Sequence, residues 1–436
     1  MKKLYIPILL GALFFNACKS KVDVKDANPG AADFSNYVAI GNSLTAGYAD
    51  NSLYKSGQEN SYPNILAKQF TYVGSGDFLQ PLLPGETGWP SRKLVLGYDT
   101  DCKSVTSIAP IPYPEAQDTL GSSASIGHLN YGNLGVPGIK LAHIAIRGYG
   151  LLNPYAGRFF KNPSLQSPID VYLNNMPTFF SIWLGSNDVL GYATSGGNGT
   201  VGGNGLNDIT DPVNFQFLYD SLVSQLTRYG AKGVLINIPD VSSTPFFNTI
   251  DPKGLNLSIY QAQQMTDAYN ALGLSHIQFK EGANYFIVED DSLVARAMKP
   301  GELLLLSIPT DSLKCGGWGS VKPIPKRYVL DQQELANIKT ATEGFNAIIG
   351  AIASKYDLAL MDVNQYMKTI ASGITWNGVN YNLSFVSGGL FSLDGIHLTP
   401  RGNALVANEI IKVINTKYGA TIPQVNGNAY PGVKMP

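Results

Sequence analysis

The stretch at residues 37–47, YVAIGNSLTAG, constrains the fold more than any other part of this chain. Its first four residues are apolar and have the composition of a buried strand, and Gly41 and Asn42 end that strand in a polar corner. Ser43 follows directly. In an open α/β sheet such a corner lies at the carboxyl edge of the strands, where ligands bind. The stretch therefore predicts an exposed serine hydroxyl at that edge. The simpler alternative is that Ser43 only caps a helix.

Other apolar runs along the chain predict further strands and helices. Strand-like runs end near Gly138 and Asn187, and two more lie at residues 233–239 and 358–363. Helical spacing of apolar residues occupies the segments 62–67, 215–229, 260–274, 334–356 and 402–418. Each connection between strands is longer than a dozen residues, which favours parallel pairing with helices on both faces. The prediction is an α/β protein with a parallel sheet of about five strands.

The polar corners and one late segment supply a set of catalytic groups. Ser43 is the candidate nucleophile, and His397 is its candidate base because Asp394, three residues earlier, can hold the imidazole. The backbone N–H groups of Ser43 and Gly138 and the side-chain amide of Asn187 are candidate oxyanion donors. The remaining histidines are interpreted as structural: His128, His143 and His276.

These residues stand in four short blocks whose order resembles that of the SGNH hydrolase superfamily, the GDSL esterases and lipases. The blocks occupy residues 41–44, 133–138, 185–188 and 394–397. The resemblance covers residues 36–418 and implies a flavodoxin-like three-layer α/β/α sandwich. It also implies ester hydrolysis by Ser43, His397 and Asp394, without a metal or organic cofactor. The chain departs from the family pattern at Asn42, where the family has Asp.

Two long excursions exceed what a minimal fold of this kind needs. Residues 71–126 are rich in proline and lack clear periodicity, and residues 280–330 form the second excursion. Each excursion contains one cysteine, Cys102 or Cys315. Outside the cytoplasm the two thiols can form a disulfide, and two buried free thiols are the alternative. The excursions leave the substrate class open.

The first residues predict export from the cytoplasm. Lys2 and Lys3 precede an apolar run that is too short to span a bilayer, and Cys18 follows Ala17. This arrangement resembles a bacterial lipoprotein signal, and an ordinary signal peptide is the alternative. The predicted organisation is a signal at residues 1–17, a tether at 18–30, a hydrolase domain at 31–418 and a tail at 419–436. The expected location is the bacterial cell envelope, with a lipid anchor on Cys18.

Composition narrows the choice of partners. Charged residues make up 14% of the chain and the formal net charge is −1. The sequence has no basic stripe of the kind that binds nucleic acid. A surface rich in neutral polar residues and tyrosine favours glycans. The first hypothesis is an esterase that deacetylates a glycan. The alternatives are a lipase or phospholipase acting on longer acyl esters, and a surface lipoprotein that binds a glycan without catalysis.

Overall fold

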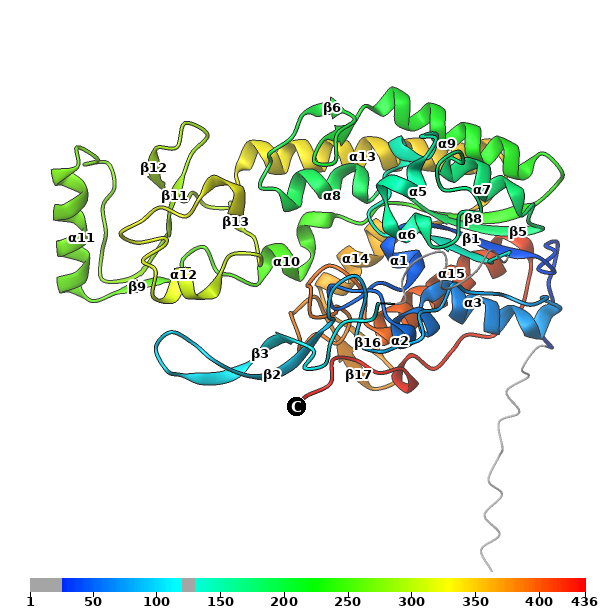
Figure 1. Cartoon of the computed structure of the whole chain (residues 1–436), viewed down its shortest axis with the longest axis horizontal. Helices are drawn as coiled ribbons and strands as arrows, with labels where there is room; N and C mark the ends of the chain where they lie inside the picture. The colour runs from blue at the N-terminus through cyan, green and yellow to red at the C-terminus, as the bar shows by residue number, and fades with distance from the viewer. Residues whose placement is uncertain (1–25, 120–129) are drawn as a thin grey trace, which may run out of the picture.

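The computed structural model describes residues 26–119 and 130–436, which are arranged around one parallel sheet (Figure 1). The predicted signal, Cys18 and His128 lie outside the described residues. The sheet has five strands in the order β15-β8-β5-β1-β4, and every neighbouring pair is parallel. Their bounds are β1 Tyr37–Gly41, β4 Asn133–Gly135, β5 Phe179–Trp183, β8 Lys232–Ile236 and β15 Ala359–Met361. The predicted five-stranded parallel sheet is confirmed.

Numbered along the chain, these strands have the spatial order 2-1-3-4-5 of flavodoxin-like folds. The order reverses between β1 and β5, and in such sheets the ligand lies beyond the carboxyl ends of the strands at that reversal. The register pairs Gly41 with Trp183, so the corners after β1 and β5 lie side by side. The topology therefore brings Ser43 and Asn187 to the same point of the sheet edge.

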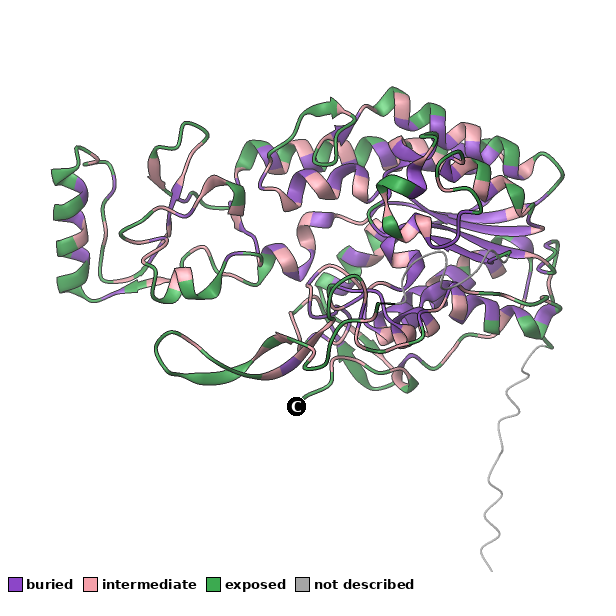
Figure 2. Ribbon diagram, in the orientation of Figure 1, coloured by how far each residue is buried: buried purple, intermediate pink, exposed green. Residues whose placement is uncertain are grey.

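Helices cover both faces because alternate strand residues point in opposite directions. In β1, Val38 and Ile40 join one apolar core, whereas Tyr37 and Ala39 join the other. The first core is covered mainly by α8 Asn187–Thr194, α9 Pro212–Thr227 and α13 Gln332–Lys355. The second is covered by α3 Tyr62–Phe70, α14 Val363–Ala371 and α15 Pro400–Tyr418. The strands between them are buried on both sides (Figure 2).

Shorter elements complete the sandwich. The helices α1 Ser43–Ala46 and α2 Lys55–Glu59 follow β1, and α5 Tyr149–Leu152, α6 Pro154–Gly157 and α7 Pro168–Asn174 follow β4. Two small strand pairs lie beside the sandwich, β6 Val201–Gly203 with β7 Ile209–Thr210 and β16 Ile374–Trp376 with β17 Val379–Tyr381.

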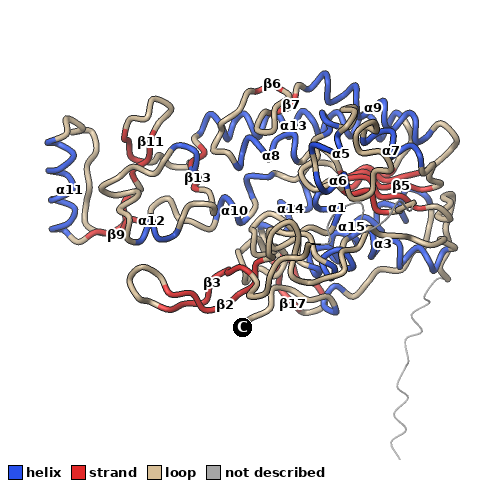
Figure 3. Tube along the Cα trace, viewed as in Figure 1, coloured by secondary structure: helices blue, strands red, loops and turns tan. Residues whose placement is uncertain are grey.

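The first excursion is more regular than its sequence suggests. Strands β2 Leu94–Thr100 and β3 Thr106–Pro112 form an antiparallel hairpin that projects from the sandwich (Figure 3). The expectation of an irregular segment is therefore wrong for residues 94–112. Pro110 and Pro112 obscured the strand pattern, because proline lacks an N–H and strands tolerate it mainly at edges. An isolated hairpin consists of two edge strands and has room for both.

The second excursion begins earlier than predicted. We call residues 245–330 the outer lobe. It contains α10 Pro245–Asn248, α11 Ile259–Ala271 and α12 Thr310–Lys314, with strands β9 Leu255–Leu257, β10 Gly282–Asn284, β11 Ile287–Glu289, β12 Ala295–Ala297, β13 Leu303–Leu304 and β14 Val329–Leu330. The predicted helix at 260–274 is α11, at the far end of this lobe (Figure 1). Its Tyr269 packs on Ile277 and Ile287 of the lobe itself. The helical periodicity of residues 260–274 predicted a buried face, but it could not show that this face packs on the outer lobe and not on the sheet.

Two links outside the backbone tie the outer lobe to the rest of the chain. Cys315, at the end of α12, forms a disulfide with Cys102 at the tip of the β2–β3 hairpin. Lys314 lies 2.9 Å from Asp101 at the same junction. The tip of the hairpin is therefore joined to the outer lobe at α12. At the inner end of the lobe, Lys326 forms an ion pair with Glu334 of α13.

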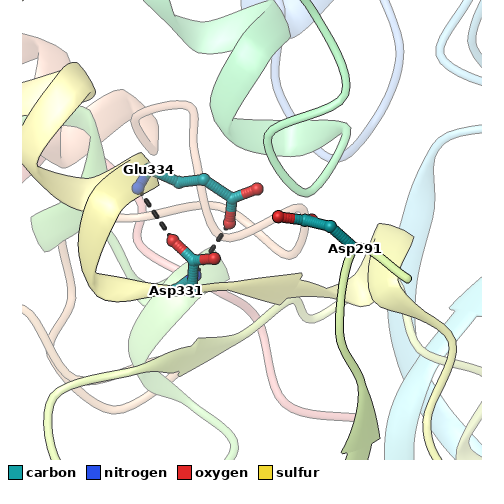
Figure 4. A group of neighbouring side chains, drawn as sticks. All are labelled: Asp291, Asp331 and Glu334. Carbon is teal, nitrogen blue, oxygen red and sulfur yellow. Dashed lines mark hydrogen bonds between the residues drawn. The ribbon is translucent and has the colours of Figure 1, made fainter. Parts of the chain in front are cut away.

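Three carboxylates surround this Lys326 side chain. Asp291, Asp331 and Glu334 bring oxygen atoms within 4.8 Å of one another (Figure 4). Asp331 and Glu334 also cap the start of α13 reciprocally, with N···O distances of 2.8 and 2.9 Å. The ammonium of Lys326 reaches all three acidic groups. Because that ammonium pairs with all three carboxylates, we interpret the cluster as a junction between lobe and sandwich.

Both ends of the described chain pack against α15. The Ala31 N–H donates to Tyr418 O at 2.8 Å, and the Thr421 N–H donates to Asn28 O at 2.9 Å. Ile422 is buried, and the Asn408 side chain accepts from the Val425 N–H at 2.8 Å. These contacts hold the first part of the tail along the helix.

In the described part of the chain, no helix combines the length and apolar character needed to cross a membrane.

Candidate active site

The turn from β1 into α1 places Ser43 at the sheet edge. A Cβ atom on Gly41 would lie 1.9 Å from Thr45 Oγ1, so a side chain at that position would block the turn. Asn42 caps α1, because its side-chain oxygen accepts from the Leu44 N–H at 3.0 Å. Asn42 therefore supplies the capping acceptor that the family's Asp would supply. Ser43 is the first residue of the helix. The capping role therefore belongs to Asn42, and Ser43 is free for the role of candidate nucleophile.

The structure brings Ser43, His397 and Asp394 into one hydrogen-bonded chain. His397 Nε2 lies 2.8 Å from Ser43 Oγ, and His397 Nδ1 lies 2.9 Å from Asp394 Oδ2. The imidazole can thus accept the serine proton on one side while its opposite N–H donates to the carboxylate. The serine and the histidine are 354 residues apart, and the sheet edge brings them together.

Asp394 is held in its ionised form by its surroundings. Its side chain is 9% exposed, and burial alone would raise the pKa of this carboxyl. The neighbouring His397 and several hydrogen bonds act more strongly in the opposite direction and hold the pKa of Asp394 well below its usual range. The backbone N–H groups of Ile396, His397 and Asn51 donate to the carboxylate at 2.8–3.0 Å. A negative charge therefore faces the imidazole.

The predicted oxyanion donors lie around the same cavity, which has a volume of about 330 Å³. Ser43, Gly138 and Asn187 all line it. Gly138 adopts a left-handed conformation with φ of 78°, which favours glycine. The Asn187 amide donates one hydrogen to Ile139 O at 2.8 Å. An amide nitrogen carries two hydrogens, so this bond orients the group and leaves a second donor.

A buried carboxylate positions Asn187. Asp188, the next residue, accepts from the Leu141 N–H and from Thr210 Oγ1, each at 2.7 Å. Burial raises the pKa of Asp188, although these donors oppose the effect. The network joins the start of α8 to the segment after Gly138. It therefore fixes two of the three predicted oxyanion donors relative to each other.

Sequence reasoning did not identify the walls of the cavity. Tyr48 packs against the His397 imidazole, with 4.8 Å between the ring centroids, and Tyr155 lies beside Tyr48. The remaining walls are formed by Asn51, Pro137, Leu190, Phe246 and Ile396. Pro137 and Ile396 lie inside two of the sequence blocks, but no motif marks Tyr155, Leu190 or Phe246, which come from α6, α8 and α10. Tyr48, just after the serine corner, is also close enough in sequence to have been suspected.

One of these wall residues belongs to the outer lobe. The Phe246 N–H donates to Gly395 O at 2.9 Å, and the Leu306 N–H donates to Phe246 O at 2.8 Å. Gly395 has φ of 73° and lies between Asp394 and His397. The second excursion therefore contacts the backbone that carries both the carboxylate and the imidazole.

The other histidines lie apart from this arrangement. His143 is buried against Tyr149, and His276 is exposed on the outer lobe. Neither lines the cavity. The third, His128, is outside the described residues.

The parallel α/β sandwich thus places a hydrogen-bonded serine, histidine and aspartate at the carboxyl edge of its sheet. The sequence model of the GDSL-like Lipase/Acylhydrolase family matches residues 37–410, and the chain belongs to that family. It is an ester hydrolase. No curated protein sequence matches the chain.

Two solved structures are similar over 88% of this chain, each at 12% identity and a TM-score of 0.34. One is an α/β hydrolase enzyme from the metagenome of Lake Arreo, Spain, matched over 96% of its length. The other is an extracellular lipase from Streptomyces rimosus, matched over 99%.

Proposed function

We propose that this protein hydrolyses carboxylic esters through an acyl-enzyme on Ser43. The hydrogen-bonded chain from Ser43 through His397 to Asp394 carries this proposal. Ser43 Oγ attacks the ester carbonyl while His397 Nε2 takes its proton. The tetrahedral oxyanion accepts hydrogen bonds from the donors at Ser43, Gly138 and Asn187. As this intermediate collapses, the alcohol leaves with the proton from His397.

Water completes the reaction. His397 removes a proton from a water molecule, whose oxygen attacks the acyl-enzyme carbonyl. The Ser43 Oγ bond to carbon then breaks, and the oxygen recovers the proton from His397. The products are one carboxylic acid and one alcohol, and the enzyme returns to its starting state. Asp394 stays ionised throughout and stabilises the imidazolium.

For the substrate, we favour a short acyl group on a glycan. Tyr48 and Tyr155 line the cavity, and aromatic side chains with a hydroxyl group suit the binding of a neutral sugar. The alternative is a longer acyl chain, which Pro137, Leu190 and Phe246 would contact through apolar surface. Nitrophenyl esters from acetyl to long acyl, with an acetylated glycan alongside, separate the two. Preference for long chains and no acetate release from the glycan would contradict the glycan proposal.

The mechanism is tested by removing the nucleophile and the base. We expect Ser43→Ala and His397→Ala to lower kcat on nitrophenyl acetate by about 10⁶, as removal of either group does in other serine hydrolases. A fluorophosphonate should label the wild-type protein and not Ser43→Ala. Retained turnover in a pure, folded Ser43→Ala protein would reject the mechanism. Absence of both turnover and labelling in the wild type would favour the non-catalytic glycan-binding alternative.

The location in the cell is a separate proposal that rests on the first 18 residues. We propose cleavage before Cys18 and a lipid anchor on that cysteine, with the mature protein in the bacterial cell envelope. Palmitate labelling of the wild-type protein and its loss in Cys18→Ser would support the anchor. Labelling that persists in Cys18→Ser would contradict it.

A further inference from the structure

A tight turn at residues 49–52 lies beside the carboxylate of the proposed triad. Ala49 and Ser52 exchange two backbone hydrogen bonds of 3.0 Å. The two residues between them have positive φ, 52° at Asp50 and 60° at Asn51. Positive φ at both central residues is the requirement of a type I′ turn, and Asp and Asn tolerate it better than other residues with side chains. The backbone there is fixed in an uncommon conformation.

One side of this turn forms hydrogen bonds with three consecutive residues, 392–394, which we call the Asp394 segment. Asp50 Oδ1 accepts from the Leu393 N–H at 2.9 Å, and the Asp50 N–H donates to Ser392 Oγ at 3.0 Å. The Asn51 N–H donates to the Asp394 carboxylate at 3.0 Å. Residues 392, 393 and 394 are thus each bonded to the turn. His397 Nδ1 and the Asn51 N–H share the same carboxylate oxygen, Oδ2.

The first excursion holds the opposite side of the turn. The Leu94 N–H donates to Asp50 O at 2.8 Å, and Ser91 Oγ donates to Asn51 O at 3.1 Å. Ser52 Oγ donates to Ser91 O at 2.6 Å. The turn therefore lies between the excursion and the Asp394 segment. Residues 91–94 of the excursion thus support the turn from the side opposite to the Asp394 segment.

The Asp50 carboxylate has a partner for each oxygen. Its Oδ2 accepts from the Tyr54 hydroxyl at 2.6 Å, and Lys93 Nζ lies 4.1 Å from the centre of the Tyr54 ring. Both carboxylate oxygens are thus used within the protein. Asp50 does not line the proposed catalytic cavity. The geometry is that of a side chain that fixes other groups, and not of a second acid that meets the substrate.

We propose that Asp50 is a positioning residue for the Asp394 carboxylate. By holding the Leu393 N–H, it sets the backbone that presents Asp394 to His397. This inference rests on the proposed function of Ser43, His397 and Asp394. A misplacement of about 1 Å at a reacting group can lower the rate about 10²-fold.

Three variants test this role on nitrophenyl acetate. Asp50→Gly removes the carboxylate but keeps positive φ without strain, so the turn itself is preserved. We expect its kcat to fall about 10- to 100-fold with KM changed less than about threefold. Asp50→Asn keeps an oxygen for the Leu393 N–H, and we expect at least about one third of the wild-type kcat. The matched control is Asp211→Ala, which removes a carboxylate that caps α9 at 2.9 Å, and its kcat should be unchanged.

The outcomes separate this inference from the proposed function. An unchanged kcat in Asp50→Gly overturns the positioning role, as does an equal loss in Asp50→Asn, which would mean that the charge itself acts. Ser43→Ala is measured in parallel, and its retained activity would reject the mechanism together with this inference. If Asp50→Gly does not fold, Tyr54→Phe decides: it frees the second carboxylate oxygen and should lower kcat about threefold. An unchanged kcat in Tyr54→Phe would also overturn the role.

Discussion

The sandwich and the outer lobe are built by different means. The sandwich has five parallel strands buried between two layers of helices, and its two apolar cores are large and continuous. The strands of the outer lobe are two or three residues long, and its two cores contain six and three buried residues. The lobe is also linked to the rest of the chain by a disulfide at α12 and by an ion-pair cluster at its inner end.

The two regions also contribute differently to the candidate site. The proposed catalytic groups all come from the ends of sandwich elements, where the sheet fixes their positions. The lobe contributes one wall residue, Phe246, and one backbone contact to Gly395. Changes in the sandwich edge should therefore alter turnover, whereas changes in the lobe should alter local stability. The following predictions test that division, from the largest expected effect to the smallest.

Asp394→Asn should have the largest effect of these changes. The amide favours the wrong imidazole tautomer, and the comparable change in another serine triad lowers kcat by about 10⁴. Steady-state kinetics on nitrophenyl acetate measure this directly. The variant keeps the shape of the side chain, so we expect it to fold, and circular dichroism checks this. A loss of less than about tenfold would show that the backbone around His397 orients the imidazole without the carboxylate.

Asn187→Ala should lower kcat by about 10² to 10³, because it removes one oxyanion donor. The donor acts only in the transition state, so KM should stay nearly constant. A matched control in the lobe is Asn284→Ala, whose amide bonds only to local backbone within 280–284. That control should leave both constants unchanged. A hundredfold rise in KM at constant kcat would make Asn187 a substrate-binding residue instead.

The same division explains what the sequence could predict. The buried strands of the sandwich are short continuous apolar runs, and its long helices repeat an apolar pattern over many residues, so both are readable in the sequence. Ser43, Asn187 and His397 stand in short blocks directly after such elements. The cavity wall is different, because Tyr155 and Phe246 reach the site through contacts between distant segments. No local pattern encodes such contacts.

Asp50 shows where a local signal existed but its partner could not be read. The Asp50-Asn51 pair suits a tight turn with positive φ. Nothing in the sequence connects that turn to Leu393, which lies 343 residues away. The packing of the lobe could not be predicted for a related reason. The buried face of α11 is readable in the sequence, but the residues that it packs against lie in loops, such as Ile277. Sequence patterns therefore located the groups proposed for chemistry better than the groups that support them.

Loss of the disulfide should mainly affect the lobe and the hairpin. We expect Cys102→Ser with Cys315→Ser to remove about 2–4 kcal/mol of stability, because the cross-link restricts the unfolded chain. Hydrogen exchange should accelerate in α12 and at the hairpin tip, while β1 and β5 stay protected. Reduction of the wild-type protein should reproduce this pattern. Equal acceleration in the sandwich strands would show that the two regions unfold as one unit.

The final prediction uses pH to compare the Asp394 contacts with the disulfide. The pKa of Asp394 is lowered in the folded protein, so its ionised contacts stabilise the fold above the unfolded value of about 3.9. That contribution is lost as pH falls from there toward the lowered folded value. Comparison with Asp394→Asn should give a difference in unfolding free energy of about 1.5–3 kcal/mol at pH 7, shrinking below about pH 4.

The disulfide carries no titrating group in this range, so its contribution should persist in acid. Denaturant unfolding of the wild type, Asp394→Asn and the double serine variant at pH 7 and pH 3 measures both differences. If the Asp394 difference stayed constant between these values, the folded surroundings would not lower the pKa of Asp394. The carboxylate would still be ionised at pH 7, but the hydrogen bonds and the imidazole around it would not be what stabilises its charge in the fold.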